Sequence, residues 1–313
     1  QTCLVQSFER PVPLNYSYSE THLDETVQDL LDANKAPIYI VSFSQKECAQ
    51  LAQAFMSINF CTKDEKKRIS HILSSYSYTS PYGKEINKYL RHGIGIHHAG
   101  LLPKYRMLVE KLAQQGLLKI ICGTDTLGVG VNIPIRTVLL TKLCKYDGQK
   151  TTLLSIRDFH QVCGRAGRKG FDDQGYVVLQ APAHVIENKK KELKAALNPK
   201  NKKKMVKSKP PEKGFIPWSN ETFQQMIQSS PETLRSQFKV DQALILAVLS
   251  RPHDNVRPLK QLLKDCHETK ASKRHLRRHG FKLFRTLLDK KIIEIIPEQE
   301  RLDTSIKLNV DLN

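Results

Sequence analysis

The stretch from Ile38 to Phe55 reads IYIVSFSQKECAQLAQAF, and it carries the pattern that decides the fold. It opens with a short apolar run, which is typical of a buried strand in a parallel sheet. Ser44 comes next, a residue type that caps helices, and apolar side chains then recur at helical spacing. A strand, a tight turn and a helix form one βα unit, and repeated units of this kind predict an α/β protein.

The same alternation continues on both sides of this unit. Thr21 is expected to cap a helix that runs to about residue 34, and Pro103 and Gly116 are expected to open and end a later helix. Further strands are expected at 93–97, 117–122, 136–141 and 175–180. The sequence therefore predicts a parallel, right-handed sheet flanked by helices, whose ligands bind beyond the carboxyl ends of the strands.

The composition points to a polyanionic partner. The 313 residues include 50 Lys and Arg against 31 Asp and Glu, a formal net charge of +19, and 40% of them are hydrophobic. The hydrophobic share excludes a disordered chain, and the charge favours nucleic acid; a solvated, charge-rich surface is the alternative. The 7 cysteines include no CxxC pair, which fits a reducing, cytoplasmic location, and no apolar run is long enough to predict a membrane span.

Two polar, glycine-rich loops carry the candidate chemistry. CGTDTLGVGVNIP (122–134) follows a predicted strand and offers hydroxyls and accessible backbone N–H groups, so it can bind phosphate or sugar. FHQVCGRAGRKG (159–170) sets Arg165 and Arg168 one turn apart, on one face of an expected helix, just after Gln161. An ordinary strand-to-helix connection and a pair of surface arginines are the structural alternatives.

A basic β-hairpin is expected between the last two strands of the sheet. Asp147-Gly148 is a strong signal for a two-residue hairpin turn, and Lys142, Lys145 and Lys150 surround it. The hairpin either contacts nucleic-acid phosphates or forms a solvated edge.

The last third of the chain is predicted to be an extension. Residues 189–209 hold ten lysines and one acid, the composition of a flexible linker or of an additional phosphate contact. Four helices and then two strands resemble a winged-helix module; they are expected at 219–228, 240–249, 259–266, 272–289, 291–296 and 305–310. Arg277 lies on the basic fourth helix, which is a candidate nucleic-acid contact or a solvated face packed on the first domain.

Several motifs resemble those of the superfamily 2 helicases. GTDTLGVGVNIP resembles motif V, QVCGRAGRKG resembles motif VI, and IYIVSFS resembles motif IV. HHAGLLPKYR (97–106) and KYDG (145–148) are similar to segments of the superkiller-like DExH helicases, and residues 232–250 resemble the start of their winged-helix region. The resemblance runs in order from about residue 1 to 183, and the chain most resembles bacterial members with a poorly characterised C-terminal extension.

This resemblance implies a RecA-like fold and roles for individual residues. ATP and Mg²⁺ are the implied cofactors, bound mainly by a first RecA-like domain of the same polypeptide, and RNA or DNA is the other implied partner. No metal ligands are expected. The expected site residues are Arg165, Arg168 and Gln161 in catalysis, with the arginines as arginine fingers, Gly130 and Asn132 near the nucleotide, and Thr124, Ser44, His98, Gly100, Lys142, Lys145 and Arg277 against nucleic acid.

The sequence has neither a GxxxxGK[ST] loop nor a DExH box, the groups that hold the phosphates and Mg²⁺ in such enzymes. Together with Gln1 in place of Met, this predicts the C-terminal half of an ATP-dependent helicase, acting on RNA, that does not hydrolyse ATP alone. The expected divisions are a lead-in segment (1–20), a second RecA-like domain (21–198), a Lys- and Pro-rich linker (199–217) and a winged-helix-like extension (218–313).

Two other functions are compatible with parts of the sequence. A basic module that binds RNA or DNA without ATP would explain the charge, although not the paired arginines. A metal enzyme using His97, His98, His160 and Cys163 is disfavoured, because adjacent residues in a strand point to opposite faces.

Overall fold

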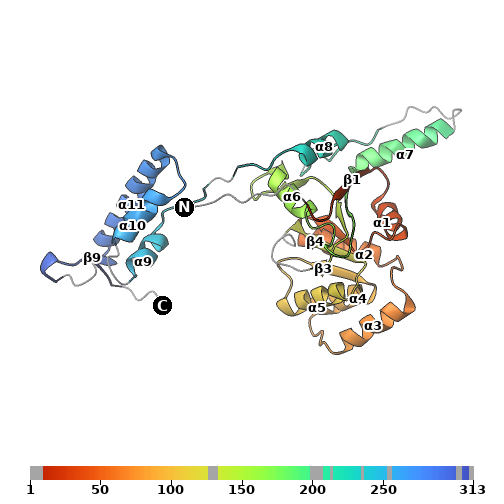
Figure 1. Ribbon diagram of the computed structural model, residues 1–313, viewed down its shortest axis with the longest axis horizontal. Coiled ribbons are helices and arrows are strands. Elements are labelled where there is room, and N and C mark those ends of the chain that lie inside the picture. Colours follow the sequence, from red (N-terminus) through yellow and green to blue (C-terminus); the bar gives the residue numbers. More distant parts are fainter. Residues whose placement is uncertain are drawn as a thin grey trace. The chain divides into compact units, whose positions relative to one another are not determined.

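The computed structural model describes residues 10–125, 133–197, 207–211, 214–233, 236–251, 256–300 and 305–309. The chain divides into two compact units, residues 1–232 and 233–313 (Figure 1).

A six-stranded parallel sheet forms the centre of the first unit, in the order β1-β8-β5-β2-β4-β3. The strands are β1 (Leu14–Ser19), β2 (Ile38–Ser42), β3 (Ile94–His97), β4 (Ile120–Thr124), β5 (Thr137–Leu140) and β8 (Gly175–Gln180). The predicted RecA-like α/β class is therefore confirmed. One difference is β1, which lies within the predicted lead-in segment but pairs in parallel with β8 as the edge strand of this sheet.

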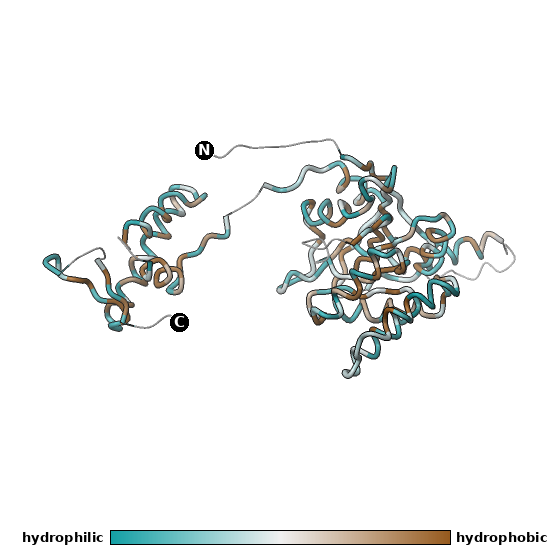
Figure 2. The backbone as a smooth tube through the Cα atoms, turned by 60° about the horizontal axis from the view of Figure 1, so that its bottom comes forward, coloured by the Kyte–Doolittle hydropathy of each residue, from teal (hydrophilic) through white to brown (hydrophobic). Residues whose placement is uncertain are grey.

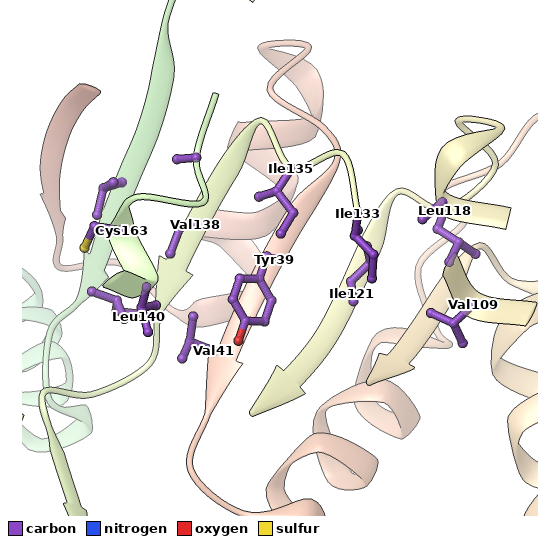
Figure 3. Packing of buried hydrophobic residues seen from close by; sticks show 14 of the residues in the cluster. Tyr39, Val41, Val109, Leu118, Ile121, Ile133, Ile135, Val138, Leu140 and Cys163 are labelled. Carbon is purple, nitrogen blue, oxygen red and sulfur yellow. The ribbon is translucent and has the colours of Figure 1, made fainter. Parts of the chain in front are cut away.

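Helices cover both faces of the sheet (Figure 1). They are α1 (Leu23–Asp32), α2 (Gln45–Phe55), α3 (Lys63–Ser74), α4 (Pro81–Arg91), α5 (Pro103–Gln114), α6 (Ile156–Cys163) and α7 (Ala183–Leu197). Ile38 and Ile40 of β2 enter one core, with α1 and α2. Tyr39 and Val41 enter the opposite core, with α3, α5 and α6 (Figure 3). The buried strands are thus apolar on both faces, as a doubly covered parallel sheet requires.

The helices begin and end largely where local sequence signals predict. The Ser44 side chain accepts a hydrogen bond from the Glu47 N–H and so caps α2. Pro103 opens α5, and Gly116 follows its end with a φ of +72°. The predicted cap Thr21 is wrong, because α1 begins after His22, which makes no side-chain capping bond.

Along the helices, hydrophilic and hydrophobic residues alternate (Figure 2).

The predicted hairpin is present, with β6 (Cys144–Tyr146) antiparallel to β7 (Thr151–Leu153). Its turn is not the predicted two-residue type, since Tyr146 pairs with Thr151 and leaves the residues between them as the loop. The Asp147 carboxylate accepts hydrogen bonds from the N–H groups of Gln149 and Lys150, and this arrangement closes the longer loop.

The boundary between the units lies further along the chain than the sequence predicts. The segment after the lysine-rich stretch, including α8 (Asn220–Gln228), belongs to the first unit. Trp218 and Phe223 are buried in its core, and the Trp218 indole N–H donates to the Gln180 carbonyl at 3.1 Å. The predicted start of the extension at residue 218 therefore differs from the structural division after Glu232.

In its described residues, the second unit has three α-helices followed by an antiparallel strand pair. These are α9 (Gln242–Leu249), α10 (Val256–Asp265), α11 (Lys270–Asp289), β9 (Ile293–Ile295) and β10 (Ile306–Leu308). Val240, Ile245, Leu287 and Ile293 form part of its separate core. The predicted helical extension ending in a hairpin is confirmed.

Within the part of the chain that the structure describes, every helix is too short or too polar to cross a membrane.

Candidate functional site

Several predicted site residues lie at or just after the carboxyl ends of neighbouring strands. In the sheet, Ser42 of β2 lies beside Thr124 of β4, and Val41 lies beside Leu140 of β5. The loops after these strands therefore start at one edge. In parallel sheets this edge is where ligands bind.

Lys145 joins three elements at this edge. Its ammonium, on strand β6 of the hairpin, lies 3.1 Å from Asp125, which directly follows β4, and 2.9 Å from Asp158 in the first turn of α6. Burial would lower the pKa of Lys145, but its hydrogen bonds to Asp158 and Asp125 outweigh burial and raise that pKa. The Lys145 ammonium thus links the hairpin to the loop after β4 and to the helix that carries Gln161.

Two hollows adjoin this junction, and Asp125 lines both. One, of about 170 Å³, is lined by Asp125, Asp158, Gln161 and Val162. The other, of about 390 Å³, lies between Phe43, Asp125 and residues 145–147 of the hairpin. The structure therefore brings Gln161 and the hairpin to adjacent recesses.

Lys142 ties the start of the hairpin to α2. Its ammonium lies 2.6 Å from the Glu47 carboxylate, whose other oxygen accepts the Phe43 N–H at 3.1 Å. Ser44 is exposed, lies between Phe43 and Glu47 in the sequence, and caps α2. Lys142 and Lys145 are thus both paired with carboxylates. A phosphate that contacts them has to share or replace these partners.

The sequence predicts that the paired arginines lie on one helix, but the structure does not place them there. Helix α6 ends at Cys163, and Gly167 has a φ of +85°. A Cβ at Gly167 would lie 2.5 Å from a Val12 methyl group, so only glycine fits this turn. Arg165 and Arg168 therefore lie in a loop, and their directions are set by the turn rather than by helical spacing.

Arg168 is bound to a carboxylate of the same loop. Its Nε and Nη2 atoms each donate to Asp172 at 2.6 Å. Burial would raise the pKa of Asp172, but the hydrogen bonds from Arg168 outweigh it and hold that pKa below its ordinary value. The same pairing raises the pKa of the Arg168 guanidinium.

Arg165 acts electrostatically on the carboxyl edge. Burial raises the pKa of the Tyr39 hydroxyl well above its ordinary value, the charge of Asp125 adds to this, and the charge of Arg165 opposes it. The Tyr39 hydroxyl donates to the Thr124 carbonyl at 2.5 Å. Arg165 thus lies close enough to β2 and the end of β4 for its charge to matter there.

The other predicted nucleic-acid contacts differ in exposure. His98, a predicted nucleic-acid contact, is 2% exposed, and its Nε2 lies 2.8 Å from the Tyr82 hydroxyl. Burial, and then the charge of His97, lower the His98 pKa. Thr124 is 8% exposed. Gly100 is exposed, and a Cβ there would lie 2.5 Å from the Gln45 side chain, which places it beside the start of α2.

Two predicted nucleotide contacts, Gly130 and Asn132, lie outside the described residues. Arg277 lies in the second unit, exposed on α11, where it lines a groove of about 850 Å³ between α10 and α11. The other cations of this groove are Arg257, Lys260 and Lys264.

Within the described ranges, no group of three or more His, Cys, Asp or Glu residues is arranged to hold a metal ion. His97 instead lies 3.3 Å from the Glu110 carboxylate, and His160 lies 3.1 Å from the Ser229 carbonyl.

Several functional neighbours could not be found from the sequence. Asp125 and Asp158 pair with Lys145 only through the tertiary fold, whereas Asp172 lies four positions after its partner Arg168. The Arg10 guanidinium donates to the carbonyls of Gly164 and Ala166, although it lies more than 150 positions earlier. Asp125 had one available signal, since it directly follows Thr124 in the motif V-like loop.

Two known families match the chain. Residues 50–170 match the helicase conserved C-terminal domain, which includes β3, β4, the hairpin and α6. Residues 181–313 match a domain of unknown function (DUF3516).

Three of the curated relatives are helicases by name. Exosome RNA helicase MTR4 of Mus musculus is 38% identical over 160 residues, 49% of this chain and 15% of its own. DExH-box ATP-dependent RNA helicase DExH9 of Arabidopsis thaliana is 34% identical over 179 residues, 55% of this chain and 18% of its own. Antiviral helicase SKI2 of Saccharomyces cerevisiae is 35% identical over 165 residues, 50% of this chain and 13% of its own.

The chain thus spans less than a fifth of the length of each of these relatives. Residues 50–170 match the helicase conserved C-terminal domain, and about half of the chain is similar to a part of the helicases MTR4 and SKI2.

Proposed function

We propose that the chain is the part of an ATP-dependent RNA helicase that senses the nucleotide and grips the strand. The observation that carries the proposal is the Lys145 junction, which ties the hairpin to Asp125 and Asp158. One end of this junction, Asp158, lies on α6, the helix that carries Gln161 and leads into the loop of Arg165 and Arg168 (the arginine loop), and the other end, Lys145, lies on the hairpin. A conformational change at the nucleotide can therefore be transmitted to the hairpin through the Lys145 ammonium.

The nucleotide side consists of Gln161, Arg165 and Arg168. ATP, held mainly by a first RecA-like domain of the same polypeptide with Mg²⁺, supplies the hydrolysable phosphate. Amide and guanidinium donors fit the negative charge of a phosphate group, and an arginine from a second domain stabilises the charge that develops on transfer. Arg165 orients toward the phosphates, and Arg168 holds the loop to Asp172. Gly130 and Asn132 are the further proposed nucleotide contacts.

The strand side consists of the hairpin, Ser44, Gly100 and the loop from Thr124. Tyr146 is 66% exposed beside the paired Lys145, so its ring is available to stack on a base. Aromatic stacking and phosphate contacts together bind single strands with little sequence preference. Lys142 and Lys145 reach a backbone phosphate when it replaces their carboxylate partners.

The second unit provides a separate contact for the strand. Arg257, Lys260, Lys264 and Arg277 surround the α10–α11 groove, and the phosphate backbone is the polyanion such a groove fits. This groove is the observation that favours the second candidate function, a nucleic-acid-binding module that works without ATP.

Titration with a labelled single-stranded RNA tests the two candidates. The chain is measured alone and together with the ATP-holding domain, with and without a non-hydrolysable ATP analogue. The helicase function predicts that RNA affinity changes with the analogue only when the ATP-holding domain is present. An RNA affinity that changes with neither the ATP-holding domain nor the analogue supports the ATP-independent module instead.

A further inference from the structure

Two parts of the chain that match different families meet in the first unit. Helix α6 lies in the helicase match, whereas α8 and the residues after it lie in the match to the domain of unknown function. The Phe223 ring of α8 is fully buried, and it meets the Phe159 ring of α6 edge-on with centroids 5.9 Å apart. The two segments therefore share one core.

Glu232 provides the N-terminal cap of α6 from outside that helix. The first N–H groups of a helix have no partners within the helix. The Ile156 N–H donates to one oxygen of the Glu232 carboxylate at 2.7 Å, and the Arg157 N–H donates to the other at 3.1 Å. The next two N–H groups bond to Ser155, the Asp158 N–H to its Oγ at 3.0 Å and the Phe159 N–H to its carbonyl at 2.9 Å. Glu232 thus satisfies half of this group.

Charge favours the same arrangement. A carboxylate at a helix N-terminus is stabilised by the aligned peptide dipoles. Hydrogen bonds from the Ile156 and Arg157 N–H groups lower the pKa of Glu232, so the residue is ionised at neutral pH. The contact is also reciprocal, because the Arg157 guanidinium donates to the Glu232 carbonyl and His160 lies 3.1 Å from the Ser229 carbonyl.

Helix α6 is held at its other end by Arg10, which donates to the carbonyls of Gly164 and Ala166. Gln161 lies near the end of α6, and Arg165 follows directly after it. The two groups that hold the ends of the helix therefore help to fix the backbone that carries these side chains.

We propose that Glu232 is a positioning residue for Gln161 and Arg165, which makes the segment before the second unit a working part of the ATPase site. This inference rests on the proposed function. Glu232 touches neither nucleotide nor strand; it acts by fixing the start of the helix whose far end carries the phosphate-facing groups. A displacement of about 1 Å at such groups lowers a rate by up to about a hundredfold.

The test compares three variants of an intact polypeptide that contains both this chain and the ATP-holding domain. Glu232→Ala removes the cap, Glu232→Gln keeps one oxygen acceptor, and Glu300→Ala removes an exposed glutamate of the second unit as a charge-matched control. ATPase kinetics give kcat and KM, and amide hydrogen exchange of residues 156–163 reports the order of α6.

The expected result is a fall in kcat of about tenfold or more for Glu232→Ala, with KM for ATP changed by less than about twofold. Glu232→Gln recovers part of kcat, Glu300→Ala matches the unaltered protein, and exchange in α6 rises for Glu232→Ala while the sheet amides stay protected. Those sheet amides show that the variant is folded.

An unaltered kcat in Glu232→Ala, with an active parent protein, overturns the inference and leaves the proposed function standing. Absence of ATPase in the parent protein overturns the proposed function, and the inference with it. Equal loss of kcat and of sheet protection in both Glu232 variants shows a general stabilising role and also overturns it.

Discussion

The Arg168 guanidinium and the Asp172 carboxylate form two hydrogen bonds of 2.6 Å each, and the Arg168 backbone N–H adds a third at 2.9 Å. The Asp172 side chain is only 1% exposed, and Arg136 Nε lies 3.5 Å from it. A buried carboxylate needs such donors, because water cannot supply them. Arg168 therefore has a structural role in the arginine loop in addition to its proposed role toward phosphate.

Loss of Arg168 should therefore lower stability as well as activity. Arg168→Ala leaves Asp172 buried with one remaining cation, and we expect a loss of about 2 to 3 kcal/mol in the free energy of unfolding. Lys169→Ala, an exposed neighbour, should change it by less than about 0.5 kcal/mol. Urea unfolding measures both. Equal stabilities of the two variants would show that the Asp172 pairing contributes little.

The same pair predicts a dependence on pH. The pKa of Asp172 is lower in the folded protein than its ordinary value of 3.8, so the unfolded chain binds the proton more readily. The stabilisation is complete well above that value and is lost as the pH falls below about 4 through the folded-state pKa. The stability gap between the parent protein and Asp172→Asn should shrink between about pH 6 and pH 3. A constant gap over this range in urea unfolding would contradict the assignment.

Lys145 should stabilise the junction through its charge. In Lys145→Ala, two aspartates that shared one ammonium lose it, and we expect a loss of about 1 kcal/mol at low salt, because all three side chains are partly exposed. Added salt should reduce the loss by screening the remaining like charges. Lys150→Ala, at the exposed hairpin turn, serves as the control. Thermal unfolding at two salt concentrations measures the effect, and a salt-independent loss would indicate packing instead.

Phe223 tests where the first unit ends. It is fully buried against Phe159 and Tyr16, so Phe223→Ala should destabilise the first unit by about 3 to 4 kcal/mol. Hydrogen exchange should rise in the sheet strands and stay unchanged in α11. Phe281→Ala, at a side chain that is 63% exposed, should change neither. Faster exchange confined to the second unit would support the boundary that the sequence predicts.

The sequence contains enough information for the sheet and too little for the contacts that hold the arginine loop. An apolar run such as Ile38–Ser42 predicts a buried strand because both faces of a covered sheet are apolar. The apolar face of α8 predicts that the helix is buried. It does not predict which core Phe223 enters, because periodicity does not specify the packing partner. Spacing alone placed Arg165 and Arg168 on one helix, and the turn at Gly167 removes that relation.

The contact partners of the site residues could not be predicted from the sequence, because periodicity and spacing do not specify which distant residues meet. Glu232 meets Ile156 across 76 positions, and Lys145 meets Asp125 across 20. Such pairs form only when the sheet and its loops are in place. Motif spacing makes Gln161 and the arginines candidates for the site, because that signal is local.

Measurement of ATP turnover by Arg165→Ala in an intact polypeptide, with this chain and the ATP-holding domain together, tests the central claim most directly. The account predicts that kcat falls by about a thousandfold, because the phosphate charge loses its arginine, while affinity for single-stranded RNA changes by less than about twofold. Lys169→Ala should leave both unchanged. A kcat for Arg165→Ala close to that of the parent protein would contradict the claim that this loop acts on the nucleotide.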